Sequence, residues 1–160
     1  MNCQQIFTLA QASEMLPKLK AMLSLAKEEL SEQACQLKEA VAEYERCEQD
    51  LAQMKPANST DAIAIDHLRA CRQQFEQAIQ SVTACQQNYN DCLKTWLERF
   101  SETGVLLRDL NSGLLDFPAR QGKFEYFLCW HLGEDEIGYW HMCSDGFVGR
   151  RPLSVLSEYM

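Results

Sequence analysis

Apolar residues recur at every seventh position in two long stretches of the chain. Residues about two turns apart stack on one face of a helix, so each stretch predicts a long helix with one apolar face. The first heptad row consists of Leu9, Leu16, Leu23, Leu30, Leu37, Tyr44 and Leu51, and the second of Leu68, Phe75, Val82, Tyr89 and Trp96. We expect an antiparallel, two-helix coiled-coil hairpin over residues 8–103.

Local signals place the ends of these helices. Thr8 and Gln11 form a capping-box pattern, so the first helix should begin near Thr8. Pro17 has no backbone N–H and predicts a kink or a restart. Pro56 and the capping residues around it place the tip of the hairpin near 55–60, and Gly104 is well placed to end the second helix.

After Gly104 the pattern changes from helical to alternating. Short β-rich runs at 105–110, 114–117, 124–130 and 137–141, separated by glycine-containing turns, predict a small antiparallel sheet over 104–160. The apolar face of the helices also widens near Met15, Met22 and Leu97, and extra apolar width needs a covering surface. We therefore expect an α+β fold in which the sheet packs at the base of the hairpin, and a single folding unit over 1–160.

Composition narrows the classes of partner. The chain has 160 residues and a net charge of −8, which opposes binding to nucleic acid or to an anionic membrane surface. No run of about 18 apolar residues or export signal is apparent, so we expect a cytoplasmic protein. Gln-rich flanks with few charges leave room for a second hairpin, which favours a homodimer or a helical protein partner.

Eight cysteines occur in the chain. Cys47, Cys71, Cys85 and Cys92 fall beside the heptad rows, whereas Cys35 points outward. Free cysteine packs as a small apolar residue, so filling of the hairpin interior is the favoured interpretation. The alternative is a redox or metal clip, for example between Cys47 and the turn that contains Cys71.

Residues with metal-binding chemistry cluster near the C-terminus. A hairpin centred on Glu136 would set Cys129 opposite Cys143 and His131 opposite His141, which gives a Cys2His2 set suited to zinc. Four residues on one flat face do not readily become tetrahedral, and the usual zinc-finger spacing is absent.

A carboxylate site is the second interpretation. His141 with Glu134, Glu136 or Asp116 would suit iron or manganese. Arg150, with neighbouring arginines, could bind a carboxylate or phosphate. Against both sites, histidines in a half-buried sheet are more often hydrogen-bonded core residues, and acidic turns are commonly just solvated.

Several motifs resemble the bacterial domain of unknown function 2203 family. They are Phe7-Thr8-Leu9, Gly113 to Ala119, Leu128-Cys129-Trp130, Leu132-Gly133-Glu134, Tyr139-Trp140-His141 and Gly146 to Arg150. The resemblance covers nearly the whole chain and implies no activity. It implies polar site positions at Asp116, Glu134, His141 and Arg150, whereas His131 and Cys143 depart from the family pattern.

Two hypotheses of function follow. The favoured one is a non-enzymatic interaction or scaffold protein whose helical hairpin binds a second copy or a helical partner, because the heptad rows are the strongest signal in the chain. The alternative is a metal- or small-ligand-binding protein, or an enzyme, whose site lies in the C-terminal β segment.

Overall fold

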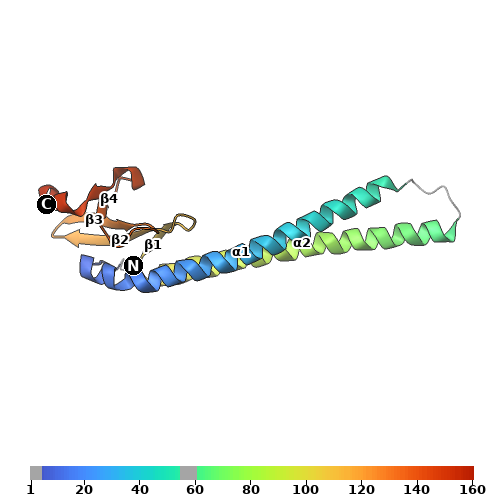
Figure 1. Cartoon of the computed structure of the whole chain (residues 1–160), viewed down its shortest axis with the longest axis horizontal. Coiled ribbons are helices and arrows are strands. Elements are labelled where there is room, and N and C mark those ends of the chain that lie inside the picture. Colours follow the sequence, from blue (N-terminus) through green and yellow to red (C-terminus); the bar gives the residue numbers. More distant parts are fainter. Residues whose placement is uncertain (1–4, 55–60) are drawn as a thin grey trace. The chain divides into compact units, whose positions relative to one another are not determined.

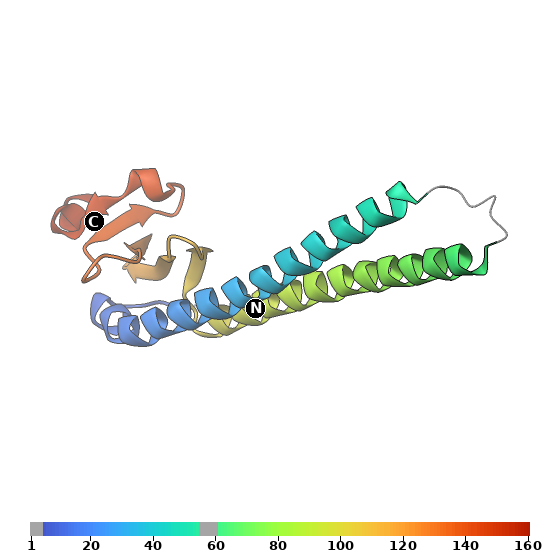
Figure 2. The ribbon, with the colours of Figure 1, turned by 45° about the vertical axis from the view of Figure 1, so that its right-hand side comes forward.

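The computed structural model describes residues 5–54 and 61–160, and it confirms the α+β fold (Figure 1). Two long helices pack together, α1 (Leu9–Gln53) and α2 (Ala62–Glu102). They are followed by β1 (Leu106–Asp109), β2 (Leu114–Gln121), β3 (Phe124–Trp130), β4 (Tyr139–Met142), a 3-10 helix η1 (Phe147–Gly149), β5 (Arg151–Pro152) and a 3-10 helix η2 (Leu153–Tyr159). Figure 2 shows α1 and α2 running side by side in opposite directions. The expected tip, residues 55–60, lies outside the described residues.

The helix ends follow the predicted signals. Thr8 N–H donates to Gln11 Oε1 (2.9 Å) and Gln11 N–H donates to Thr8 Oγ1 (3.2 Å), which is the reciprocal capping box. At the other end, α2 stops before Gly104, whose φ of 77° is left-handed.

α1 is one helix from Leu9 to Gln53, so the chain does not restart at Pro17, and the kink near 17 stays a prediction. A proline inside a helix removes one backbone hydrogen bond. Leu16 and Leu19 beside it are 5% and 0% exposed. Such packing supplies most of a helix's stability in a protein. Tertiary packing therefore keeps the helix continuous.

The sheet is antiparallel throughout, with its strands paired in chain order from β1 to β5. β3 has the predicted bounds. β2 continues to Gln121 instead of ending at 117, because Pro118 and Ala119 still pair with Phe127 and Tyr126. β4 begins at Tyr139 instead of 137, and the two-residue β5 is too short to leave an alternating pattern in the sequence.

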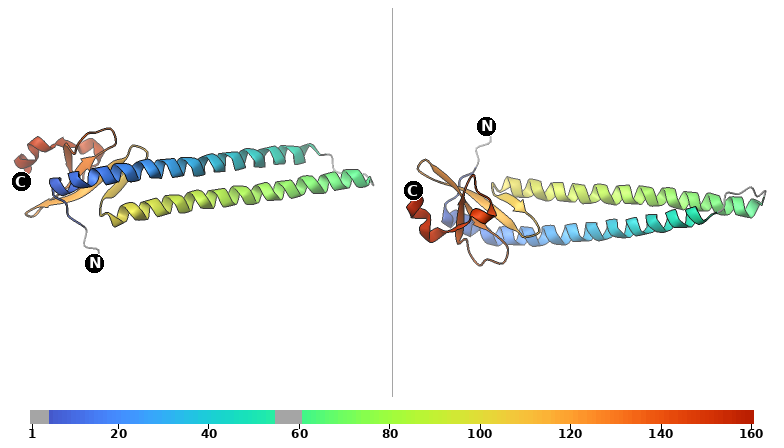
Figure 3. Two further views of the ribbon diagram at one scale, coloured as in Figure 1. Left: turned by 60° about the horizontal axis from the view of Figure 1, so that its bottom comes forward. Right: turned by 90° about the horizontal axis from the view of Figure 1, so that it is seen from above.

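One face of the sheet packs against the start of the chain. The Phe7 and Phe117 rings meet edge to face with centroids 5.7 Å apart, and Lys20 Nζ lies 5.4 Å from the centroid of Trp130. Side chains alternate between the faces of a strand, so this apolar face also contains other fully buried residues, Leu115 and Leu128. Both views in Figure 3 show strands beside the first turns of α1.

The described chain divides into two compact units. One combines the chain up to Lys27 with Lys94–Met160, and the other is Glu28–Leu93. In the first unit the heptad residues Leu16, Leu23 and Trp96 are at most 5% exposed. This burial agrees with the prediction that the wide apolar face near the base of the hairpin is covered.

In the second unit the helices meet through a thinner interior. The Tyr44 and Phe75 rings lie 5.4 Å apart, and both side chains are only half-buried. Cys47 is buried and Cys35 is exposed, as predicted. The described cysteines are free thiols, and Cys47 and Cys71 are among them. Within the described residues, neither helix is long and apolar enough to cross a membrane.

The turn between β1 and β2 offers a matched test of packing at a glycine. Gly113 and Gly122 have nearly the same left-handed φ, 65° and 62°. A Cβ at Gly113 would lie 2.8 Å from Leu132 Cβ and 3.2 Å from Leu23 Cδ1, whereas a Cβ at Gly122 meets nothing within 4 Å. An alanine would therefore have similar backbone strain at both positions, but only at Gly113 would its methyl group also clash with neighbouring side chains.

We expect Gly122→Ala to lower the free energy of unfolding by about 1–2 kcal/mol, the cost of a left-handed alanine. Gly113→Ala should cost about 1–3 kcal/mol more, because the new methyl group overpacks the contact between the turn, Leu132 and α1. Urea unfolding of both variants measures the difference. Equal losses would contradict the close packing at Gly113.

Candidate metal centre

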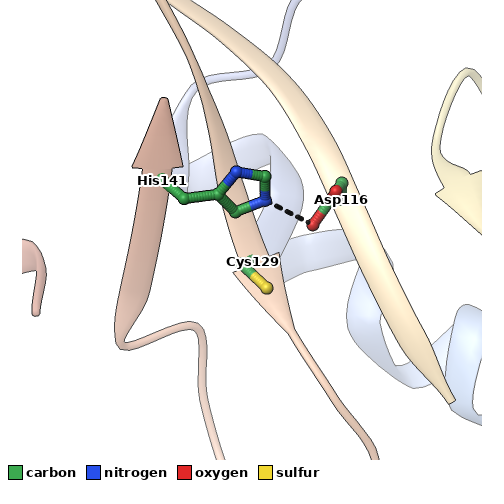
Figure 4. Close-up of side chains that lie close together, drawn as sticks. All are labelled: Asp116, Cys129 and His141. Atoms are coloured by element: carbon green, nitrogen blue, oxygen red, sulfur yellow. Dashed lines mark ion pairs between the residues drawn. The ribbon is translucent and has the colours of Figure 1, made fainter. Parts of the chain in front are cut away.

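Three neighbouring strands bring a carboxylate, a thiol and an imidazole to the face of the sheet opposite its helix-packed face. Asp116 on β2 pairs directly with Cys129 on β3. Cys129 pairs with Tyr139 on β4, and His141 follows two residues later, so its side chain returns to the same face. Figure 4 shows the three side chains converging from their separate strands.

The three side chains are buried and close together. Asp116 is 2% exposed, Cys129 is 0% exposed and His141 is 3% exposed. Each offers one ligand atom, and these atoms all lie within 4.8 Å of one another. Small side-chain rotations can bring such atoms to the distances of about 2.0–2.3 Å that zinc takes to oxygen, nitrogen and sulfur.

A backbone contact orients the imidazole of His141. Its Nδ1 lies 2.9 Å from the carbonyl oxygen of Met142, so Nδ1–H donates to that oxygen. The other ring nitrogen, Nε2, then faces Asp116 Oδ1 at 3.1 Å (Figure 4). A backbone carbonyl that fixes one ring nitrogen in this way commonly orients a histidine that binds a metal through the other.

The contact between His141 and Asp116 is close but poorly directed. Oδ1 has no well-directed hydrogen bond among the described residues, although His141 Nε2 lies only 3.1 Å away. The contact is an ion pair when the imidazole is protonated. A buried carboxylate oxygen without a directed donor is costly, and it is also free to bind a cation.

Electrostatics keep Asp116 ionised. Burial raises the pKa of its carboxyl group, but contacts with His141 and Arg108 oppose this and hold the pKa below its ordinary value. The same contact with Asp116 raises the pKa of His141 in spite of burial. The carboxylate of Asp116 therefore lies beside two groups that favour its ionised form, the imidazole of His141 and the guanidinium group of Arg108.

Cys129 is a protonated thiol in this setting. Burial and the neighbouring charge of Asp116 raise its pKa to about 12. Thiolate is the form that binds metals, so an incoming cation must displace the thiol proton.

Arg108 is the residue at this site that sequence reasoning missed. Its Nε donates to Asp116 Oδ2 at 2.8 Å, and its guanidinium group lies 5.2 Å from the centroid of Phe127. Leu106 pairs with Asp116, so alternation along β1 returns the side chain of Arg108 to the face that carries Asp116. The register between β1 and β2 that brings the two residues together is not determined by the alternating pattern of either strand.

A cavity of about 410 Å³ opens beside the three ligand atoms. Its lining includes Asp116, Cys129 and His141 together with Arg108 and the loop that follows β4. Cys143 also lines it, but its side chain is exposed. The cavity thus adjoins the cluster on one side, while the three residues themselves are almost fully buried.

The predicted Cys2His2 arrangement does not form, because the strand register differs from the expected one. Cys129 pairs with Tyr139 instead of Cys143, and His141 pairs with Phe127 instead of His131. β3 ends at Trp130 because Glu134 turns back on the chain, where its carboxylate accepts from His131 N–H and its carbonyl accepts from Trp130 Nε1. This turn places His131 beyond the strand.

Glu134 and Arg150 form a separate pair. Arg150 donates to Glu134 Oε1, and its guanidinium group lies over the rings of Tyr139 and Phe147 at 4.2 and 4.8 Å. His131 Nε2 is 3.4 Å from the same carboxylate. The structure therefore brings Asp116 and His141 together. It places Glu134, Arg150 and His131 in a second polar cluster, which connects the loop after β3 to η1.

The donor set has the chemistry of an open zinc site. Open zinc sites have three protein ligands and leave the fourth position for water or substrate. A thiolate and an imidazole favour zinc over manganese, which prefers oxygen ligands. The set joins Cys129 from the predicted zinc group with Asp116 and His141 from the predicted carboxylate group.

Comparison with known proteins adds the family but no activity. Neither a search of the curated proteins nor a search of the solved structures finds a match to this chain. Residues 5–153 match a family described as "Uncharacterized conserved protein (DUF2203)". This match spans most of the chain and agrees with the resemblance of its motifs, so the chain belongs to the DUF2203 family.

Proposed function

We propose that this protein binds a divalent metal ion, with zinc as the preferred ion, through Asp116, Cys129 and His141. The sequence alone favours a helical scaffold, but the geometry of the sheet supports the metal-binding alternative better. The observation that carries the proposal is the oxygen Asp116 Oδ1, which is buried, charged and without a directed hydrogen bond. It lies beside an oriented imidazole and a buried thiol.

A bound cation would resolve the electrostatics of the cluster. Without a cation, the negative charge of Asp116 is stabilised by a poorly directed contact with His141 and by the half-exposed Arg108. A divalent ion would replace the proton on His141 Nε2 and the thiol proton of Cys129, and would sit next to Asp116 Oδ1. All three ligand atoms would then have a partner.

Metal content is the direct test of this site. The full chain, loaded with Zn²⁺ and dialysed, should retain about one zinc ion per chain, measured by elemental analysis. Cys129→Ala should lower zinc affinity by more than about 100-fold, the upper end of the loss expected from removing a mere supporting partner of a ligand. Cys143→Ala is the matched control, because it removes a thiol that lines the same cavity without belonging to the cluster.

Thermal unfolding of the same variants separates loss of metal from loss of fold. Zn²⁺ at about 100 times its dissociation constant should stabilise the wild-type chain and Cys143→Ala by about 2.7 kcal/mol, and a chelator should reverse this. Cys129→Ala should remain folded by circular dichroism and show no shift. A folded wild-type chain that retains no zinc would overturn the proposal.

A second candidate function, self-association of the hairpin, is favoured by the exposure of its heptad rows. Leu37, Tyr44, Phe75 and Val82 are only half-buried in the second unit, and Ile79 is 42% exposed. Two helices alone therefore cover these rows incompletely. A second copy of the same hairpin would complete their burial as a four-helix bundle, and we propose a homodimer.

A charge at the half-buried heptad position 82 tests this dimer. Val82→Asp should convert it to a monomer, because the dimer interface would bury an unpaired charge. Gln80→Asp makes a comparable change at an exposed position and should leave the dimer intact. Light scattering coupled to size-exclusion chromatography gives the mass of each variant. A wild-type monomer, or an unchanged mass for Val82→Asp, would contradict the dimer.

Charge and cysteine chemistry bear on the partners and the cellular compartment of the protein. The net charge of −8 supports a protein that does not bind nucleic acid. Free thiols throughout the described chain support a reducing compartment, and we propose the cytoplasm.

A further inference from the structure

The cavity beside the metal cluster adjoins a second one. The second cavity, of about 330 Å³, is lined by Asp109, Ser112, Leu114, His131 and Phe147. Leu114 and Phe147 line both cavities. A molecule seated at the cluster can therefore extend past these two apolar side chains into the second cavity.

The charge of the loaded cluster points to a singly charged anion. A divalent ion is balanced by the carboxylate of Asp116 and the thiolate of Cys129, while His141 would bind as a neutral imidazole. Arg108 then leaves one net positive charge at the cavity. Asp145, which also lines the cavity, is already paired with Arg151 at 3.1 Å.

Arg108 has the geometry to hold such an anion. Its side chain is 44% exposed, and the bond to Asp116 uses Nε. The two terminal nitrogens of a guanidinium group form a planar fork that matches a carboxylate. An anion with one oxygen at the open metal position can place its other oxygen at this fork.

Phe147 is held in place to cover an apolar substituent. The Arg150 guanidinium group lies 4.8 Å from its ring centroid, and the His131 ring lies 5.7 Å away edge to face. The residue is nevertheless 48% exposed, so apolar surface remains for a ligand to bury. Leu114 adds apolar surface between the same two cavities.

We propose that the site takes an organic carboxylate with an apolar substituent. Its carboxylate binds the open position of the metal and the guanidinium group of Arg108, and its apolar part packs on Phe147 and Leu114. This inference rests on the proposed metal site and adds the chemical class of its ligand.

Phenylacetate, acetate and phenylacetamide are probes that separate charge from apolar surface. Each is titrated into the full chain loaded with Co²⁺, which gives a visible spectrum that reports the ligands of the metal. Phenylacetate should change the spectrum and bind about tenfold or more tightly than acetate, because its ring buries apolar surface. Neutral phenylacetamide should leave the spectrum unchanged.

Variants assign the two parts of the ligand. Arg108→Gln should keep about one cobalt per chain but weaken phenylacetate about 10- to 100-fold, as expected for a lost hydrogen bond between charged groups. Phe147→Ala should weaken phenylacetate towards the affinity of acetate and leave acetate unchanged. Arg120→Gln removes an exposed arginine that is paired with Glu125 and does not line the cavity, so it serves as the control.

The outcomes distinguish this inference from the metal site. A chain that binds no cobalt overturns both proposals. A cobalt-loaded chain whose spectrum ignores phenylacetate, or responds more strongly to inorganic phosphate, overturns the carboxylate inference and leaves the metal site standing. Loss of phenylacetate binding in Arg120→Gln, to the same extent as in Arg108→Gln, would overturn the role of Arg108.

Discussion

The register between β2 and β3 decides which side chains reach each face of the sheet. Phe117 pairs with Leu128 on one face, and Asp116 pairs with Cys129 on the other. Because side chains alternate, a slip of one residue would expose the apolar set and turn the carboxylate towards α1. Burial of Phe117 against Phe7 therefore holds the candidate metal ligands in place as well as the fold. The pairing of β2 with β3 therefore determines both the apolar packing on one face and the candidate site on the other.

Much of the fold could be predicted because its signals are local or periodic. The heptad rows, the capping box at Thr8 and the left-handed Gly104 each depend on a few neighbouring residues. The site depends on pairing between strands that periodicity does not determine. The turn that Glu134 makes moves the partner of Cys129 from Cys143 to Tyr139, and the pairing of Leu106 with Asp116 brings Arg108 to the face that carries Asp116. Both effects arise only once the strands are assembled.

The two polar clusters show how similar residues serve different ends. Glu134 Oε1 accepts from a terminal nitrogen of Arg150, and the rings of Tyr139 and Phe147 flank the guanidinium group, although its buried Nε has no hydrogen-bond partner among the described residues. Asp116 and His141 are more deeply buried, and the atom without a hydrogen-bond partner there is a carboxylate oxygen, Oδ1. A guanidinium N–H cannot bind a cation, whereas a carboxylate oxygen can. An incomplete match in a buried cluster is what a site needs if a cation is to bind there.

The burial of Cys129 also bears on the chemical durability of the chain. Oxidants and alkylating agents attack the thiolate, and a fully buried thiol with a pKa of about 12 presents almost none of it. Cys35 and Cys143 are exposed, so damage should reach them first. Burial thus keeps the sulfur of this candidate metal ligand in a chemically unreactive form. A cluster protected in this way would retain its ability to bind the proposed ion after the exposed thiols have been oxidised.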